Sequence, residues 1–402
     1  MAAAFVVSAA VAVSAGCASE ATVRRPDASA RAATTQDQAR LLSMADEVAA
    51  MIPGEDFEVD RSVDRAAIVE CCIALGDLDR AEAFAARIEN WRRGDALVRV
   101  GKARLAAGDR AGAERCAGRA LSDAGSWKDW GIERVSAAAA SLWIALGDPN
   151  RAKALLPAEA VDLRGAFEAS RVATVPAAEL PAMMDAFDRA IETQNLDVAR
   201  GAVDGYLAVL ARALASRDAV LEDRSRAAID KAVPGLPHDL QIDTMLRVND
   251  ALRDAGRADA ARSEVEKAAA AFGRMEFEVQ ARPTVGIPIA EAQWRLGDRA
   301  AALARMDELR DAFLARMQEV TDLRRATPLR ALAEGYMLAG ERGRADAAYA
   351  AALAEGARNP NARPRANDLC TTMVSMARSG FVPPQPMERT MASIRAGLAA
   401  PW

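Results

Sequence analysis

The sequence has little of several residue types on which enzyme sites depend. Its 402 residues include a single histidine, His238, and aromatic residues make up 4% of the chain. A Ser-His-Asp or Cys-His relay would have to use His238, and histidine-rich metal sites are excluded. Because Pro234 and Pro237 come just before it, we expect His238 to lie in a solvent-exposed loop between long helices.

Cysteine is also scarce, and its spacing does not match a metal or redox motif. No CxxC pair occurs among the five cysteines, so zinc and thioredoxin-like sites have no support. Neighbouring side chains on a helix point about 100° apart, so Cys71 and Cys72 are poorly placed to bridge each other. Two interpretations stay open: either of them pairs with Cys116 in an oxidising compartment, or these cysteines and Cys370 are small buried apolar residues.

The chain has no excess of positive charge. Its 52 basic and 57 acidic residues are interspersed and give a net charge of −5, with an isoelectric point near 5.4. Nucleic-acid binding would need a basic stripe, which is missing, so we expect no nucleic-acid partner. Mixed charge runs such as Asp322 to Arg325 are typical of solvated helix faces with ion pairs.

Carboxylate pairs occur, but the aromatic platforms of a sugar-cleaving site are scarce. A glycosidase needs two carboxylates facing a sugar across a cleft. Neighbouring acids are common in a chain with so many of them; examples are Asp307 with Glu308, Glu276 with Glu278, and Asp185 with Asp188. No glycine-rich phosphate loop with a Walker lysine is present. The sequence therefore predicts no cofactor, metal or catalytic residue.

What the chain does have is alanine and a repeated register. Hydrophobic residues reach 51%, much of it alanine, the strongest helix former, and we find no alternating strand pattern. Six times, a glycine is followed five positions later by alanine, and in five of these the residue after the glycine is acidic. The pairs are Gly76 with Ala81, Gly108 with Ala113, Gly147 with Ala152, Gly256 with Ala261, Gly297 with Ala302, and Gly340 with Ala345. Such a register predicts an all-α repeat architecture of stacked helical hairpins.

Each element of the register has a physical reason. Glycine adopts the left-handed conformation that ends a helix without a side-chain penalty. The acidic residue after it caps the next helix or faces that helix's positive end. The alanine would lie one turn into the second helix, on the face toward its partner, where a methyl group lets the two axes approach closely. We therefore expect these alanines to be buried.

One stretch, from Asp95 to Ala120, resembles a tetratricopeptide repeat. Gly101 matches the small residue of the first helix, Gly108 the turn, and Ala113 with Ala120 the alanines of the second helix. Departures from the pattern are Leu97 where the family often has tryptophan, Arg104 where it often has tyrosine, and Gly125 where proline often closes the unit. The resemblance implies a degenerate tetratricopeptide-like α-solenoid, or superhelix, that binds proteins.

The spacing of the repeats is irregular. Successive turn glycines lie 32 to 43 residues apart except between Gly147 and Gly256, where Gln194 stands in a similar motif and Ala199 keeps the offset. A further turn is expected at Gly380. We therefore divide the chain into a leader at 1–16, a lipidated cysteine and flexible spacer at 17–40, tetratricopeptide-like repeats at 41–160, irregular repeats with longer helices at 161–250, and tetratricopeptide-like repeats with a terminal capping helix at 251–402.

The N-terminus gives a second signal. Residues 2–16 form an uncharged apolar run with the length of a secretory h-region, too short for a comfortable membrane span. The run ends in Ala15, Gly16 and Cys17, which resembles the lipobox of bacterial lipoproteins, although Ser14 replaces the usual leucine and a basic n-region is missing. The resemblance implies lipidation of Cys17 and a periplasm-facing, membrane-anchored protein. An ordinary cleaved signal peptide, giving a soluble secreted or periplasmic protein, is the alternative.

These observations favour a non-enzymatic scaffold that binds an extended segment or helix of a protein partner in a concave groove. The aromatic and basic residues expected to contact the partner are Trp91, Arg92, Arg93, Trp127, Lys128 and Trp130. Packing between helices is the alternative role for the tryptophans, Trp143 included. Two other functions stay open: a helical toroid or solenoid enzyme acting on polysaccharide or cell wall, and a structural subunit of an outer-membrane assembly complex.

Overall fold

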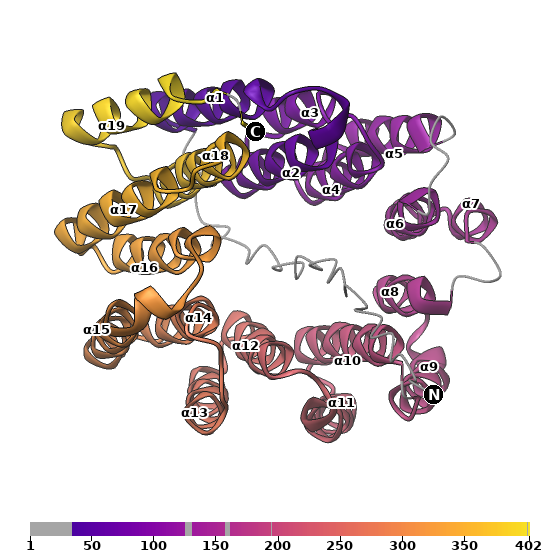
Figure 1. Ribbon diagram of the computed structural model, residues 1–402. Helices are drawn as coiled ribbons and strands as arrows, with labels where there is room; N and C mark the ends of the chain where they lie inside the picture. Colours follow the sequence, from indigo (N-terminus) through magenta and orange to yellow (C-terminus); the bar gives the residue numbers. More distant parts are fainter. Residues whose placement is uncertain (1–33, 125–130, 157–160, 194, 400) are drawn as a thin grey trace, which may run out of the picture.

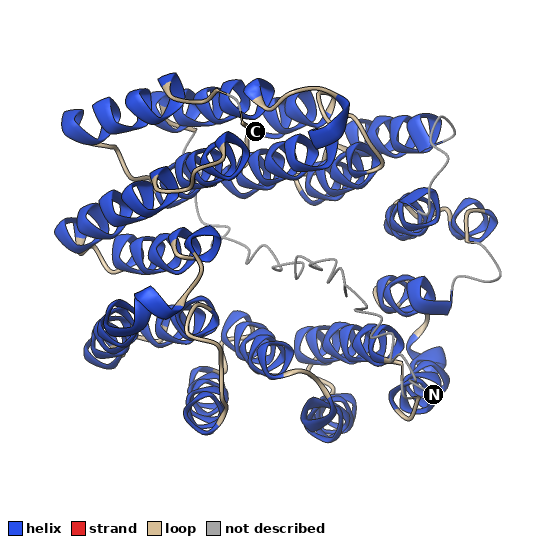
Figure 2. Cartoon of the chain, in the orientation of Figure 1, coloured by secondary structure: helices blue, strands red, loops and turns tan. Residues whose placement is uncertain are grey.

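The computed structural model describes residues 34–124, 131–156, 161–193, 195–399 and 401–402. In this part of the chain the secondary structure consists of α-helices and short 3-10 segments, and no strand is present (Figure 2). The predicted all-α solenoid of stacked antiparallel hairpins is confirmed. The predicted leader at 1–16, Cys17, and most of the spacer lie outside the described residues. The first described helix, α1, covers Gln36–Met51 and therefore begins within the range assigned to the spacer.

Nine of the described helices form an inner row in which each packs against the next (Figure 1). They follow the chain in order, and most are the first helix of a hairpin. They are α2 (Glu58–Leu75), α4 (Arg92–Ala106), α6 (Gly131–Ala145), α8 (Val161–Arg171), α10 (Leu196–Ser216), α12 (His238–Asp254), α14 (Ala281–Arg295), α16 (Ala326–Leu338) and α18 (Ala362–Ser379).

The other helices lie outside this row. Most pack against the inner helix that precedes them, whereas α9 packs against α10, which follows it. They are α3 (Leu78–Ala85), α5 (Arg110–Ala124), α7 (Pro149–Ala154), α9 (Leu180–Ile191), α11 (Ala219–Ala232), α13 (Ala258–Arg274), α15 (Arg299–Arg316), α17 (Arg342–Ala357) and α19 (Gln385–Ala396). Short 3-10 segments occupy some of the connections: η1 (Glu55–Phe57), η2 (Ala177–Glu179), η3 (Val233–Gly235), η4 (Met317–Glu319) and η5 (Asp322–Arg324).

The turn glycines end their helices as predicted. All six have φ between 74° and 88°, the left-handed region in which glycine carries no Cβ penalty. At Gly76 the backbone N–H bonds to the carbonyl of Ile73 and that of Asp77 bonds to the carbonyl of Cys72, which is a Schellman motif. The same pair of bonds recurs at the other five glycines and at Gly380.

The alanines of the register are also where we expected them. Ala81, Ala113, Ala152, Ala261, Ala302 and Ala345 are all fully buried, whereas Ala199 is half-buried. The small side chain allows close contact between neighbouring helices. At Gly101, for example, an added Cβ would lie 2.6 Å from a methyl carbon of Leu142 on the next inner helix. Dispersion contacts along such close crossings take the place of large core side chains.

The predicted acidic caps are present at three of the five turns. Asp77, Asp109 and Asp148 each accept a hydrogen bond from the backbone N–H three residues later. This satisfies one of the free donors at the start of the second helix. Asp298 and Glu341 stand at the same position without a side-chain cap. The favourable placement of negative charge near a helix N-terminus still applies to both.

The row of inner helices closes on itself, which the repeat pattern did not indicate. The last inner helix, α18, packs against the first, α2, and also against α1 along its length (Figure 1). Helix α1 therefore fills the place beside α18 that a second hairpin helix fills elsewhere, while α19 touches α18 only lightly. The result is a ring of hairpins. We call the junction of α1, α2 and α18 the closing seam.

Residues from both ends of the chain share one hydrophobic core at the closing seam. Leu41 and Leu42 of α1 and Met373 of α18 are fully buried in the same cluster. The Gln38 side chain donates a 2.9 Å hydrogen bond to the carbonyl of Ala377. Gln38 also completes a capping box with Thr35, which fixes the start of α1.

Ion pairs add to the seam at its surface. Arg40 of α1 bonds Glu388 of α19 at 2.6 Å, and Arg395 of α19 lies 2.8 Å from Glu47 of α1. All four of these side chains are substantially exposed, so each pair contributes little alone. The shared apolar core supplies most of the attraction between the two ends.

Candidate functional site

The inner face of the ring is formed in part by an exposed stripe of α2. This helix is covered by α1 and α3 behind it and by α18 and α4 at its sides. The uncovered stripe therefore faces the centre of the ring. It carries Val59 and Val63, which are 56% and 43% exposed, followed by Glu70 two turns further on. Exposed β-branched side chains on a helix are available for contact with another molecule.

Ion pairs join neighbouring inner helices around much of the ring. They cross from α2 to α4, from α10 to α12, from α16 to α18 and from α18 to α2. The pairs are Glu70–Arg99 at 3.3 Å, Asp204–Arg247 at 2.6 Å, Asp368–Arg330 at 2.9 Å, Glu334–Arg378 at 3.9 Å and Asp60–Arg363 at 3.3 Å. The inner helices therefore present charges of both signs, arranged across hairpin boundaries.

The closing seam contains a buried carboxyl group. Asp64 of α2 is 2% exposed, and its Oδ2 has no hydrogen-bond partner. Burial and the nearby Asp60 charge raise the pKa of Asp64 well above its usual range, while Arg330 acts in the opposite direction. Burial also raises the pKa of Asp368, against the effect of its ion pair with Arg330. The Oδ1 of Asn367 is a second buried acceptor without a donor here.

Trp91, one of the residues predicted to contact a partner, lies in the interior between two hairpins. It is 8% exposed and packs between hairpins, where a Cβ on Gly131 would lie 2.1 Å from its ring. The guanidinium groups of Arg92 and Arg134 stack on the ring at 4.7 and 5.4 Å. Trp91 therefore packs between helices, the alternative role that the sequence left open for it. Trp143 is buried as well, with the guanidinium of Arg151 at 3.7 Å from its ring.

The other predicted contact residues divide into two groups. Arg92 and Arg93 are half-buried at the start of α4, and Arg93 lies 3.2 Å from Asp123. Trp127, Lys128 and Trp130 lie outside the described residues, as does Cys17. The partner-contacting role of this set stays a prediction.

The four described cysteines are free thiols in the interior. Burial raises the pKa of Cys71 to about 12 and that of Cys116 to about 11, and it also raises the pKa of Cys72 and Cys370. Thiols with a raised pKa are poor nucleophiles because the thiolate is the reactive form. The sequence left open a disulfide or a small buried apolar residue. In the structure these cysteines are small buried residues.

Several members of the carboxylate pairs noted in the sequence are bound by arginine or tyrosine. Arg224 bonds both Asp185 and Asp188, at 2.5 and 3.4 Å. Asp307 accepts from the hydroxyl of Tyr336 at 2.8 Å and lies 3.0 Å from Arg344. Within the described ranges, no group of three or more His, Cys, Asp or Glu side chains could hold a metal ion. These acids bind helices to one another.

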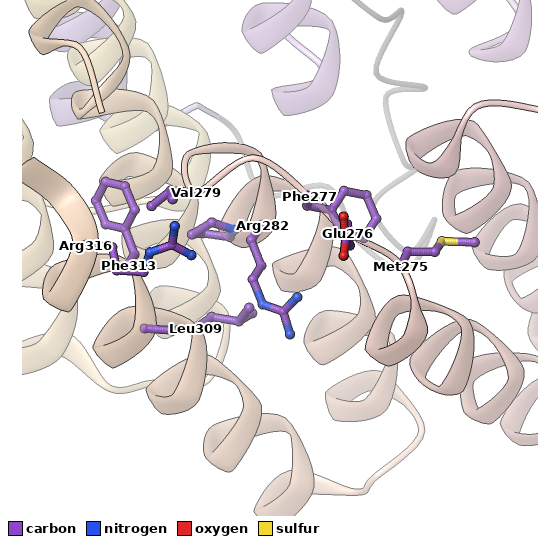
Figure 3. A pocket seen from close by; sticks show the side chains of 10 residues that line it. Met275, Glu276, Phe277, Val279, Arg282, Leu309, Phe313 and Arg316 are labelled. Carbon is purple, nitrogen blue, oxygen red and sulfur yellow. The ribbon is translucent and has the colours of Figure 1, made fainter. Parts of the chain in front are cut away.

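One described pocket has a volume of about 450 Å³. It lies between the loop that joins α13 to α14, the first turn of α14, and the last turns of α15. Figure 3 shows Leu309 and Phe313 on one side and Glu276 and Phe277 on the other, with Arg282 between them. Glu276 is the single carboxylate in its lining, so a two-carboxylate mechanism has no pair in this pocket.

His238 contacts the wall of this pocket that Glu276 and Phe277 form. It is exposed and is the first residue of α12 rather than part of a loop, because Pro237 precedes it and starts the helix. Its ring meets Phe277 edge-on at 5.9 Å, and its Nδ1 lies 3.4 Å from the carbonyl of Glu276. Phe277 in turn stacks on Phe272 at 5.2 Å. The histidine holds the loop that forms this wall.

In the described part of the chain, none of the helices is both long and apolar enough to cross a membrane. No family model matches the chain, and no curated protein matches it either.

Proposed function

We propose that this protein is a non-enzymatic scaffold of tetratricopeptide type that binds a protein partner on the inner face of its ring. The observation that carries the proposal is the exposed stripe of α2, on which Val59 and Val63 stand open between two ion-paired helix boundaries. An amphipathic helix or an extended segment could bury these valines and exchange ion pairs with Glu70 and its neighbours.

The charge distribution of the inner face favours a partner with charges of both signs. Arg99 lies on one side of the stripe and Arg363 on the other. Arg99 is paired with Glu70, and Arg363 is paired with Asp60. Because rim charges mainly set specificity and association rate, the affinity would come from the valines. Arg92 and Arg93, at the start of the neighbouring α4, are part of the same proposal.

Site-specific photo-crosslinking in cells tests this function. A photoreactive amino acid in place of Val63 is expected to give a discrete adduct with one partner. Val220, which is 78% exposed on α11, a helix outside the inner row, is the matched control. An adduct at Val63 that also forms with Val220, or no adduct at Val63 while the protein stays folded, would contradict an inner-face binding site.

We further propose that the protein is anchored to the bacterial cell envelope through lipidated Cys17 and faces the periplasm. The proposal rests on the apolar run at 2–16 and the residues Ala15 to Cys17. Replacing Cys17 by alanine is expected to move the protein from the membrane fraction to the soluble fraction. Membrane retention of the variant equal to that of the unchanged protein would count against the lipid anchor.

A further inference from the structure

The pocket between α13, α14 and α15 is lined by both apolar and charged side chains. Phe313 and Leu309 of α15 are almost completely buried, and Pro283 is buried beside them. Met275 and Phe277, from the connecting loop, are half-buried. The volume of about 450 Å³ is within the range of pockets that bind small molecules. An apolar group of matching size would gain about 25 cal/mol per Å² that it removes from water.

Two arginines line the same pocket, and they differ in their partners. Arg316 is bound by Glu319, with three contacts of 2.7 to 3.1 Å. Arg282 stacks on Phe272 at 4.8 Å, and no carboxylate of the described residues lies within ion-pair distance of it. Its side chain is half-buried and extends between the two walls (Figure 3). A half-buried guanidinium without a counter-ion attracts an anion strongly.

The positive charge of Arg282 acts on a neighbouring arginine, Arg305. Burial lowers the pKa of Arg305 on α15, Glu308 opposes this, and the charge of Arg282 lowers the pKa further. Arg305 makes a 3.1 Å hydrogen bond to the neutral side chain of Gln293. Positive charge at this end of the hairpin is therefore incompletely balanced.

We infer that this pocket binds a small amphipathic carboxylate. The alkyl part would lie against the half-buried side chains of Phe277 and Val279, and the carboxylate would accept hydrogen bonds from Arg282. Glu276 at the rim disfavours a second negative charge, so a monocarboxylate with an unbranched alkyl chain fits better than a dicarboxylate. The site is separate from the inner-face stripe of α2, and its failure would leave the proposed scaffold function unaffected.

Calorimetric titration of the full chain with octanoate tests the inference. Saturable binding is expected, and octan-1-ol and octylammonium should bind at least tenfold more weakly because they lack the carboxylate. Arg282→Met should weaken octanoate binding at least tenfold, whereas Arg299→Met, which removes one charge from exposed Arg299 of the same hairpin, should leave it unchanged.

A pocket-filling variant decides the location independently of Arg282. Ala312 lines the pocket and is exposed, so Ala312→Trp should abolish binding without disturbing the fold. Ala315→Trp, one turn nearer the end of α15 and also exposed, is the control. The inference is overturned if octanoate shows no saturable binding, if octylammonium binds equally well, or if Ala312→Trp binds octanoate like the unchanged protein.

Discussion

Two kinds of boundary hold this ring together, and they use different chemistry. Between α4 and α6 the helices approach through small residues, with Gly101 against Leu142. At the closing seam the helices also meet through buried polar groups: Arg65 of α2 lies 3.2 Å from Asp46 of α1, and the carboxyl group of Asp64 is buried on α2. Hairpins that follow one another are also held close by the chain that connects them. The ends of the chain must find each other, and paired charges add specificity to that contact.

The largest effect is expected at the small-residue boundary. Gly101→Leu should destabilise the protein by about 2–3 kcal/mol, because the added atoms would overlap Leu142 and Cys116 in a packed interface. Chemical denaturation followed by circular dichroism measures the change. Gly118→Leu is the control in the same hairpin: its added Cβ meets nothing within 4 Å, so the better helix propensity should leave stability equal or slightly higher.

An intermediate effect is expected at the closing seam. The pKa of Asp64 is raised in the folded protein, so its ionisation opposes folding as pH rises above the ordinary aspartate pKa. Asp64→Asn should therefore stabilise the protein by about 1 kcal/mol at pH 7. Near pH 4 the advantage should shrink, because the carboxyl is then increasingly protonated in both states.

Denaturation at several pH values measures this dependence. The groups that face Asp64 are Asp60 on its own helix, Arg330 on α16 and Asp368 on α18. Asp259→Asn, at a fully exposed side chain on α13, is the control. A variant that is less stable than the unchanged protein at pH 7 would show that the Asp64 carboxylate stabilises the seam.

The smallest effect concerns a described helix-ending turn that has arginine instead of glycine. Arg217 ends α10 with φ of 57° and makes the same pair of backbone bonds as the turn glycines. Arg217→Gly should stabilise the protein by about 0.5 kcal/mol by removing the left-handed penalty. The opposite substitution can be made at a turn glycine. An added Cβ at Gly297 would meet nothing within 4 Å, so Gly297→Arg should lower the free energy of unfolding by about 1 kcal/mol through its backbone conformation alone. Equal stability of all three proteins would contradict the role of φ.

The hairpins could be predicted from the sequence because their signals are local. A glycine at a helix end and an alanine five residues later act within two turns of the chain, so Gly76 and Ala81 are sufficient to place one bend. The Arg217 turn was missed because arginine rarely adopts φ above zero. Five positions after Arg217, where the register has alanine, the chain has Glu222, whose carboxylate is buried.

Glu222 and the other exception of the register occur together. Arg257 is the single basic residue at the position after a turn glycine, and it lies 2.9 Å from Glu222. The acidic residue in place of alanine and the basic residue in place of an acid therefore form an ion pair between neighbouring hairpins. A signal of this kind becomes visible only when the two turns are brought side by side.

Ring closure and the pocket could not be predicted for a different reason. Closure depends on small rotations summed over all hairpins, and no single residue encodes it. The pocket takes its lining from Met275 to Arg316, at spacings that match no motif. The repeat pattern placed Trp91 between hairpins, but it could not distinguish stacking on a ligand from the packing between helices that the structure has.

The place of α1 at the closing seam has a mechanical consequence. Residues before Thr35 continue directly into the helix whose contacts with α18 keep the ring shut. A pull on the N-terminal segment is therefore borne first by these noncovalent contacts rather than by the hairpins. Tension applied at that end would peel away α1 and open the ring, because α1 is the helix that holds the two ends together.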